Sequence, residues 1–219
     1  MTPKQPFAGT ISAVVAQEKA RRHLGARVNV FIADKFSFAV SADVAFKHGL
    51  CPDLTLSEDD LAQILREDGE AKALQTALNF LAVRARSREE IRKRLARDEW
   101  SETVISRVLE RLENVQLLDD GAFARGHVEN RSRFRPRGAG MLKQELRQKG
   151  VTKEEIEAAL PDAESETQNA VLALQKAARR LEKFEGREQQ NKAIELLARR
   201  GFSYGIAKTA FKIWSEDEN

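Results

Sequence analysis

Apolar and polar residues follow two different patterns along the chain, and the change comes near residue 56. Before that point, residues 27–32 and 36–40 alternate between apolar and polar side chains, and residues 10–16 form a short apolar run. A period of two is typical of a β-strand, and residues 33–35 predict a hairpin turn. We therefore expect a small antiparallel sheet. Its second strand should place Val28, Val30 and Ile32 on one face, and its third strand Phe36, Phe38 and Val40.

A sheet of this size is only marginally stable alone, because it buries little apolar surface. Residues 42–48 are a candidate for a helix that covers it. From Ser57 onward the apolar residues recur at helical spacing instead. Ser57 is a suitable N-cap, and the three acidic residues after it suit the positive end of a helix dipole. Residues 71–83 should then form a helix with an apolar stripe of Leu74, Leu78 and Leu81.

A repeat of 51 residues runs through the helical part. Leu95, Leu146 and Leu197 follow one another at intervals of 51 residues. Four residues after each leucine comes a position where a helix can end, then an apolar residue, then a hydroxyl residue that can cap the next helix. The three helix-ending residues are Glu99, Gly150 and Gly201. The apolar residues are Trp100, Val151 and Phe202, and the hydroxyl residues are Ser101, Thr152 and Ser203.

Capping boxes mark further helix starts. The pairs with the required spacing are Ser87 with Glu90, Thr152 with Glu155, and Ser165 with Gln168. We expect one more helix before each helix pair, over residues 71–83, 120–134 and 165–184.

The predicted fold is therefore mainly α. Three tandem three-helix units of helix–turn–helix type should form an elongated, curved array after a small N-terminal antiparallel β subdomain. The expected boundaries are residues 1–56 for the β region with its short helix, 57–118 for a linker helix and the first unit, 119–163 for the second unit, and 164–219 for the third.

Common catalytic and cofactor-binding motifs are absent from the sequence. It contains no G-x-x-x-x-G-K-[ST] loop, no G-x-S-x-G and no G-x-G-x-x-G. Asp119 and Asp120 form an acidic pair, but no further carboxylates follow at a spacing that suits a metal. We expect one of the two to cap the helix over 120–134. The sequence thus predicts a protein without enzymatic activity, cofactor or metal.

Composition limits the cellular setting. Cys51 is the only cysteine, so no internal disulfide can form. No apolar run approaches the roughly 20 residues of a membrane span, and residues 1–7 lack the apolar core of a signal peptide. We expect a cytoplasmic protein with no membrane partner.

The net charge of +3 conceals an uneven distribution. Residues 125–149 contain eight basic and two acidic residues, and residues 131–137 contain four arginines and no acid. Guanidinium groups bind phosphate or carboxylate in bidentate fashion, so this region is a candidate binding site. We expect Phe134 to pack inward and to hold the arginines outward. The candidate residues are Arg131, Arg133, Arg135, Arg137, Lys143, Arg147 and Lys149. A second group, Arg84, Arg86 and Arg88, has the alternative interpretation of a mixed-charge helix surface in water.

Four segments resemble the RecX family. Residues 84–91 with Leu95 are similar to the family's R-x-R-S-x-x-E-L pattern, and residues 118–124 match L-D-D-x-x-F-A. Gly138 with residues 145–151 matches G…E-L-x-x-K-G-[IV], and residues 200–204 match R-G-F-S-Y. Order and spacing agree over residues 71–213, and residues 27–40 resemble the N-terminal hairpin of longer members. The sequence departs from the family at Glu99 and at Val115–Gln116, where glycine is common.

The resemblance implies a non-enzymatic regulator of the RecA recombinase. Such proteins bind RecA, free or as a filament on single-stranded DNA. They restrain filament growth, ATP hydrolysis and strand exchange, and so modulate recombination, DNA repair and the SOS response. A curved helical array suits this role, because its concave face can follow a filament. The ten basic residues named above would contact RecA or DNA, and the chain would act as a monomer. The alternatives are a helix–turn–helix protein that binds nucleic acid directly, and a helical scaffold without a nucleic-acid role.

Overall fold

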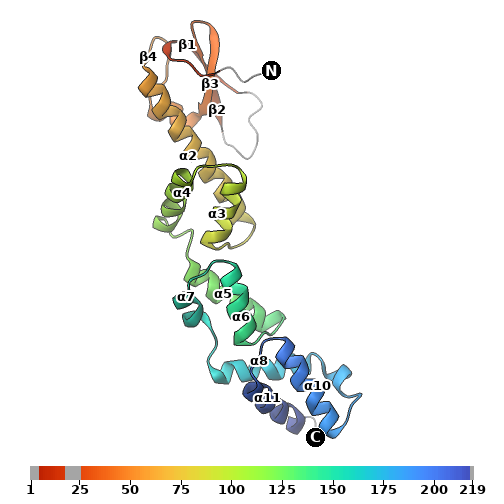
Figure 1. Ribbon diagram of the computed structural model, residues 1–219. Helices are drawn as coiled ribbons and strands as arrows, with labels where there is room; N and C mark the ends of the chain where they lie inside the picture. The colour runs from red at the N-terminus through yellow and green to blue at the C-terminus, as the bar shows by residue number, and fades with distance from the viewer. Residues whose placement is uncertain (1–4, 18–25, 218–219) are drawn as a thin grey trace. The chain divides into compact units, whose positions relative to one another are not determined.

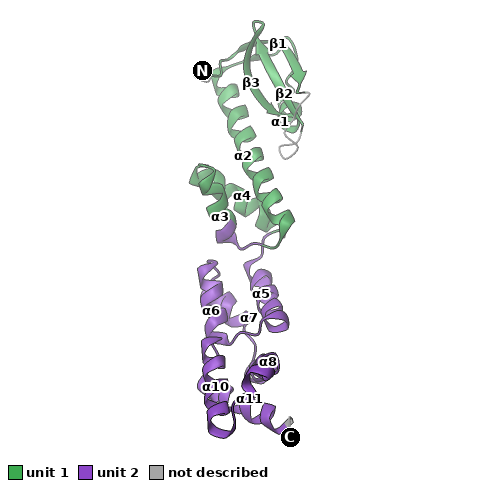
Figure 2. Ribbon diagram, turned by 90° about the vertical axis from the view of Figure 1, so that its right-hand side faces the viewer, with its two compact units in different colours: residues 1–85, 91–117 green, residues 86–90, 118–219 purple. Residues whose placement is uncertain are grey.

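A computed structural model describes residues 5–17 and 26–217 of the chain (Figure 1). Residues 1–4 and 18–25, in the expected β region, and residues 218–219, in the expected third unit, lie outside the described part. The chain divides into two compact units (Figure 2). Unit 1 comprises residues 1–85 and 91–117, and unit 2 comprises residues 86–90 and 118–219.

Unit 1 begins with the predicted antiparallel sheet. Its strands are β1 (Gly9–Ala16), β2 (Arg27–Ile32), β3 (Lys35–Ser41) and β4 (Thr55–Leu56), in the order β3-β2-β1-β4. Ala33 and Asp34 form the hairpin turn, and both have positive φ, as a two-residue turn that matches strand twist requires. Lys35, which we expected in the turn, pairs with Ile32 as the first residue of β3. Strand β4 was not predicted, since two residues are too few to show alternation.

Phe36 does not share the buried face of β3, contrary to the sequence expectation. The register between β2 and β3 shifts so that Val30 pairs with Phe38 and Phe31 with Phe36. Ser37 is therefore an extra residue on β3, and such a bulge reverses the faces on its two sides. Phe38 remains buried, whereas Phe36 is exposed and packs edge-on against Phe31. The buried Ser37 hydroxyl donates to the Phe7 carbonyl, 2.7 Å away.

Two helices cover the sheet. Helix α1 (Ala42–Lys47) begins at the N-cap Ser41 and buries Val44 and Ala45, as predicted for this segment. Helix α2 (Glu58–Val83) begins at Ser57, which forms a capping box with Asp60. Leu61 and Ile64 of α2 join the core of the sheet.

Helix α2 is 26 residues long, and its second half continues without a break into the first helical repeat. There the fully buried residues are Ala73 and Ala77, whereas the three leucines of the expected stripe are only half-buried. The small alanine side chains allow a neighbouring helix to approach closely, and α4 (Glu102–Asn114) packs against α2.

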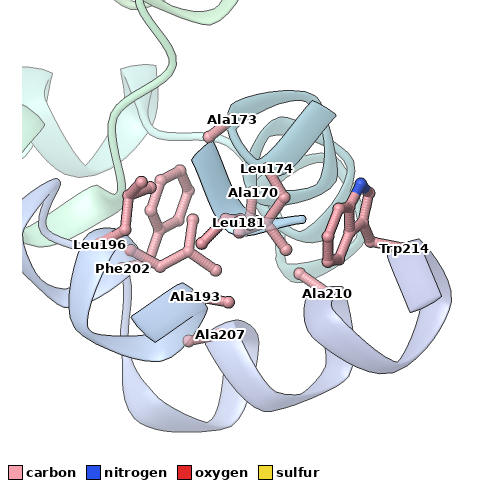
Figure 3. Packing of buried hydrophobic residues seen from close by; sticks show 11 residues of the cluster. Ala170, Ala173, Leu174, Leu181, Ala193, Leu196, Phe202, Ala207, Ala210 and Trp214 are labelled. Atoms are coloured by element: carbon pink, nitrogen blue, oxygen red, sulfur yellow. The ribbon is translucent and has the colours of Figure 1, made fainter. Parts of the chain in front are cut away.

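Unit 2 contains the later repeats. The second repeat comprises α5 (Asp120–Phe134), α6 (Ala139–Gln148) and α7 (Lys153–Ala159). The third comprises α8 (Ala163–Gln175), the short α9 (Ala178–Leu181), α10 (Gly186–Arg199) and α11 (Tyr204–Asp217). Figure 3 shows the core of the third repeat, where Leu174, Phe202 and Trp214 pack among alanines.

Two details of the third repeat differ from the sequence expectation. Asp162, and not Ser165, is the N-cap of α8, and its carboxylate accepts a hydrogen bond from the Ser165 amide at 2.8 Å. The expected helix over residues 165–184 ends at Gln175 and is followed by the separate α9. The other two predicted capping boxes, at Ser87 and at Thr152, are confirmed.

The three repeat leucines occupy equivalent, fully buried positions, as predicted. Leu95 lies in α3 (Arg88–Arg97), Leu146 in α6 and Leu197 in α10, and each has a relative exposure of 0%. The carbonyl of each leucine accepts a hydrogen bond from the amide five residues later, in Trp100, Val151 and Phe202. The residue before that amide has positive φ in all three turns: Glu99, Gly150 and Gly201. This is the hydrogen-bonding pattern that closes a helix with a left-handed residue.

None of the helices in the described part of the chain combines the length and the apolar composition needed to cross a membrane.

Candidate binding surface

The arginines of segment 131–137 extend from the last turn of α5 into the loop that follows. Asp119 caps the start of α5, so the expectation that an aspartate serves this role is confirmed. Arg135 is the C-cap, and the buried Pro136 comes next, where its ring prevents the helix from continuing. The Lys176 ammonium donates to the carbonyls of Arg133 and Phe134, at 2.9 and 3.2 Å. These two bonds fix the end of α5 against the end of α8.

Phe134 does not pack inward, so the sequence expectation for this residue is wrong. Its relative exposure is 62%, and the Arg133 guanidinium lies 5.4 Å from the centre of its ring. The core-facing residues of α5 are Ala124 and Val128. Phe134 comes six residues after Val128, which places it about 120° around the helix from that face. The buried Pro136 holds this segment instead.

Glu145 on α6 organises part of the basic segment. Its carboxylate accepts hydrogen bonds from His127 Nε2 at 2.7 Å and from Arg131 Nε at 2.8 Å. Arg137 Nε lies 3.9 Å from the other carboxylate oxygen. Burial raises the pKa of Glu145, but the hydrogen bonds from His127 and Arg131 outweigh this effect and leave the pKa below its usual value. Glu145 is therefore a stable anion that orients two of the arginines.

The two lysines among the seven candidates, Lys143 and Lys149, form ion pairs with glutamates on other helices. Lys143 lies 2.8 Å from Glu157 on α7, and Lys149 lies 3.2 Å from Glu90. The Lys149 ammonium also lies over the ring of Phe123. Arg147 is exposed on α6. The seven candidates thus do not form one group of unpaired charges: the exposed, outward members are Arg133, Arg135 and Arg147.

The second candidate group surrounds the start of α3. Arg84 and Arg88 are exposed, whereas Arg86 is half-buried. Arg84 donates to the carbonyl of Ala85, and the amide of Arg88 donates to the Asp120 carboxylate at 2.7 Å. Of these two bonds, only that of Arg84 involves a guanidinium group, so the interpretation of this group as a binding site or as a charged helix surface stays open.

A basic pocket lies at the end of α5, and sequence reasoning found only half of it. Its volume is about 250 Å³. Two of its cations, Arg135 and Arg137, were candidates, whereas Lys176 at the end of α8 and Arg200 at the end of α10 were not. The repeat could have indicated Arg200, which comes 51 residues after the candidate Lys149. It could not have indicated Lys176, because the first helices of the second and third repeats begin only 43 residues apart, at Asp120 and Ala163. The lining residues are Phe134, Arg135, Pro136, Arg137, Lys176 and Arg200.

Within residues 5–17 and 26–217, no three His, Cys, Asp or Glu side chains are grouped so that they could hold a metal ion.

Comparison with family models places RecX domains along the chain. The model of the RecX N-terminal domain matches residues 10–57. The models of the first, second and third RecX three-helix domains match residues 73–112, 119–160 and 164–211.

The similar proteins and solved structures are also named RecX. The protein "Regulatory protein RecX" of Bacillus subtilis is 33% identical over 186 residues, which cover 84% of this chain and 70% of that protein. Its counterpart in Leuconostoc mesenteroides is 31% identical over 201 residues, covering 90% and 73%. Among solved structures, "Crystal structure of regulatory protein RecX" matches with a TM-score of 0.73 at 27% identity, over 95% of this chain and 99% of that one. The structure of RecX from Lactobacillus salivarius matches with a TM-score of 0.63, also at 27% identity, over 68% and 98%.

Proposed function

Because the chain belongs to the RecX family, which consists of regulatory proteins and not of enzymes, we propose that it regulates RecA. It binds RecA, free or as a filament on single-stranded DNA, and restrains filament growth, ATP hydrolysis and strand exchange. The observation that carries this proposal is the ordered match of four RecX domains along the chain. The proposed setting is the cytoplasm, where RecA and its DNA are found.

Residues 131–137, the basic segment at the end of α5, are our candidate for the surface that contacts RecA. Arg133 and Arg135 are exposed, and neither forms an ion pair with a carboxylate in the described part of the chain. Their backbone is held by Lys176 and Pro136, so binding of a partner needs to order only the side chains. A filament offers both acidic side chains and DNA phosphates to such guanidinium groups. We assign the contact first to these two arginines, and next to Arg131 and Arg137, which Glu145 orients.

The proposed contact predicts the effect of reversing two charges. Arg133→Glu combined with Arg135→Glu should weaken inhibition of RecA by about 10-fold or more, because charges at an interface govern both encounter and release. The measurement is the rate of DNA-stimulated ATP hydrolysis by RecA as the protein is titrated in. Arg137 is left unchanged, because a glutamate there would face Glu145 and disturb the fold.

A matched control makes this test specific. Arg179→Glu with Arg187→Glu changes the net charge by the same amount at two other exposed positions of unit 2. Both double variants should keep the helical signal of the wild type, since exposed substitutions usually change stability by only about 0.5 kcal/mol each. If the α5 variant inhibits RecA as well as the control does, this surface is not the contact.

Direct binding to nucleic acid is the alternative, and the basic pocket is the observation that favours it. A protein that acts only in this way would bind DNA without RecA and would leave the ATPase of a preformed filament unchanged.

A further inference from the structure

The pocket at the end of α5 gathers four cations around a space that contains no carboxylate. Arg135 and Arg137 come from the loop after α5, Lys176 from the C-cap of α8, and Arg200 from the C-cap of α10. All four belong to unit 2, so the pocket lies within one compact unit. Groups of like charge repel one another, so an anion bound in this space would stabilise the arrangement. Glu145 lies 3.9 Å from Arg137 and offsets only part of the positive charge.

Arg200 shows this imbalance most clearly. It is half-buried, and within the described residues no carboxylate forms an ion pair with it. Burial lowers the pKa of Arg200, and the charge of Arg137 lowers it further. Its backbone is fixed, because its carbonyl accepts a hydrogen bond from the Gly138 amide at 2.9 Å. The guanidinium therefore starts from a fixed point at the pocket and has no carboxylate partner among the described residues.

The repeat provides an internal comparison. Arg200 corresponds to Lys149 in the preceding repeat, and Met141 corresponds to Glu90. The carbonyl of Lys149 also accepts a hydrogen bond from the start of a helix, in this case from the Ser87 hydroxyl at 2.6 Å. Lys149, however, has an acidic partner, because its ammonium lies 3.2 Å from Glu90. Methionine in place of glutamate removes that partner from Arg200. The charge of Lys149 is therefore neutralised by Glu90, whereas the equivalent charge of Arg200 is left without an acid at the equivalent position, Met141.

We propose that this pocket binds a phosphate group of a single-stranded nucleic acid backbone. Its volume of about 250 Å³ accommodates a phosphate with part of its sugar. Guanidinium groups match the oxygens of a phosphate through paired hydrogen bonds. Phe134, exposed at the rim, offers a face on which an adjacent base stacks, as aromatic side chains do in proteins that bind single strands. A protein carboxylate would use the cations but not this ring.

This proposal does not rest on the proposed function. Two of its four cations lie outside the basic segment of α5, and its test contains no RecA. The proposal that the pocket binds phosphate can be wrong while the proposed regulation of RecA is right, and the reverse also holds.

The sharpest test restores the missing acid. Met141→Glu places beside Arg200 the residue that Glu90 provides for Lys149, and Met141→Gln is a control of the same size without charge. Binding is measured by fluorescence anisotropy with a labelled oligothymidylate of about 15 nucleotides, near the upper end of common site sizes. We expect Met141→Glu to weaken binding by about 10-fold and Met141→Gln by less than about 2-fold, because only the former competes with the phosphate. Equal affinities of the two variants would overturn the proposal.

A second pair of variants tests the pocket without adding an acid. Arg200→Gln should weaken binding and reduce the dependence of log affinity on log salt concentration by about 0.7, the value for one phosphate contact on a single strand. Arg199→Gln removes the same charge one residue away, at an exposed position that pairs with Glu195, and should change neither quantity. Circular dichroism checks that all four variants are folded. Similar losses in both arginine variants would mean that only the net charge matters.

The choice of probe identifies the ligand. An oligonucleotide with neutral methylphosphonate linkages should lose the difference between Met141→Glu and Met141→Gln, because its backbone carries no anion. If polyglutamate displaces DNA at equal charge concentration, or if the wild-type protein binds no oligothymidylate at low salt, the pocket is not a site for nucleic acid phosphate.

Discussion

Two residues that replace an expected glycine keep the backbone conformation that favours glycine. Glu99 occupies the position that is glycine in the other two repeats, and its φ is 61°. Gln116, in the other step where the family resemblance leads us to expect a glycine, has a φ of 57°. Both residues therefore adopt the left-handed conformation that the glycine pattern indicates. For a residue with a Cβ this conformation costs about 1–2 kcal/mol.

Glu99→Gly should therefore stabilise the protein. Relief of the left-handed strain gains about 1–2 kcal/mol, and the greater entropy of glycine in the unfolded chain offsets about 0.5–1 kcal/mol of this. We expect a net increase of up to about 1.5 kcal/mol in the free energy of unfolding, measured with urea. A decrease would show that the Glu99 side chain contributes more than the strain removes.

Gly201→Ala is the matched opposite case. The φ of Gly201 is 86°, and an added Cβ would lie 2.5 Å from the Cβ and the amide nitrogen of Met141. The strained backbone alone costs about 1–3 kcal/mol, and the close contact adds to this. The same urea titration should therefore show a clear loss of stability for Gly201→Ala.

Individual side chains were harder to place from sequence than backbone conformations. Phe36 was assigned to the wrong face because a single extra residue, Ser37, changes the strand register, and no local pattern reveals such a bulge. The expectation that Phe134 packs inward fails because the core face of α5 is set by Ala124 and Val128, and Phe134 lies about 120° around the helix from Val128. The buried Pro136, which holds the segment instead, depends on the tertiary fold.

At the scale of elements, polar contacts join the sheet to α2. The buried Asp68 of α2 accepts hydrogen bonds from Arg27 of β2 and from the Ser41 amide, and it lies 2.8 Å from Lys72. The preceding residue, Glu67, accepts hydrogen bonds from Lys47 and His48, both at 2.9 Å, at the end of α1. The apolar pattern predicted that helices cover this sheet. It could not show these contacts, because they join residues between 19 and 41 positions apart in the sequence.

Acid should weaken this connection. Hydrogen bonds from Lys47 and His48 lower the pKa of Glu67 from 4.5 to about 2. Burial raises the pKa of Asp68, but the bonds from Arg27 and Lys72 leave it below its usual value. A carboxyl group with a depressed pKa stabilises the folded state fully above its ordinary pKa and loses this contribution as pH falls through the folded value. Stability should therefore decrease between about pH 4.5 and 2.

The measurement is the urea midpoint at a series of pH values. Glu67→Gln should start from a lower stability and should show a shallower decrease, since one of the titrating groups is gone. A midpoint that stays constant over this range would contradict the assigned roles of the two carboxylates.

At the scale of the whole molecule, the repeat was the most informative feature of the sequence. The period of 51 residues predicted three buried leucines and the turns that follow them, because each turn closes locally, through a bond between the leucine carbonyl and the amide five residues later. The sequence did not reveal that the first helix of the first repeat is fused with the helix that covers the sheet, nor that Lys176 and Arg200 meet Arg135 and Arg137. Both depend on how helices distant in sequence pack.

The equivalence of the repeats predicts equivalent energetics. Leu95→Ala, Leu146→Ala and Leu197→Ala each remove a fully buried side chain, and each should cost about 2–5 kcal/mol of stability. The three variants are compared in urea against Leu117→Ala, which alters an exposed leucine and should cost less than about 1 kcal/mol. A variant of the three that behaves like Leu117→Ala would not occupy a true core position.

The junctions of unit 2 also bear on how tandem copies of a module can diverge. The acceptor is a main-chain carbonyl in both copies, at Lys149 and at Arg200, and the donors are Ser87 and Gly138. Substitution does not remove a carbonyl, so the side chain attached to it can change without loss of the junction. A duplicated module can thus acquire or lose a charge partner, as Glu90 and Met141 illustrate, while the carbonyl acceptor of the junction is retained. A new binding site can then arise by side-chain substitution at a position whose backbone hydrogen bond is already formed.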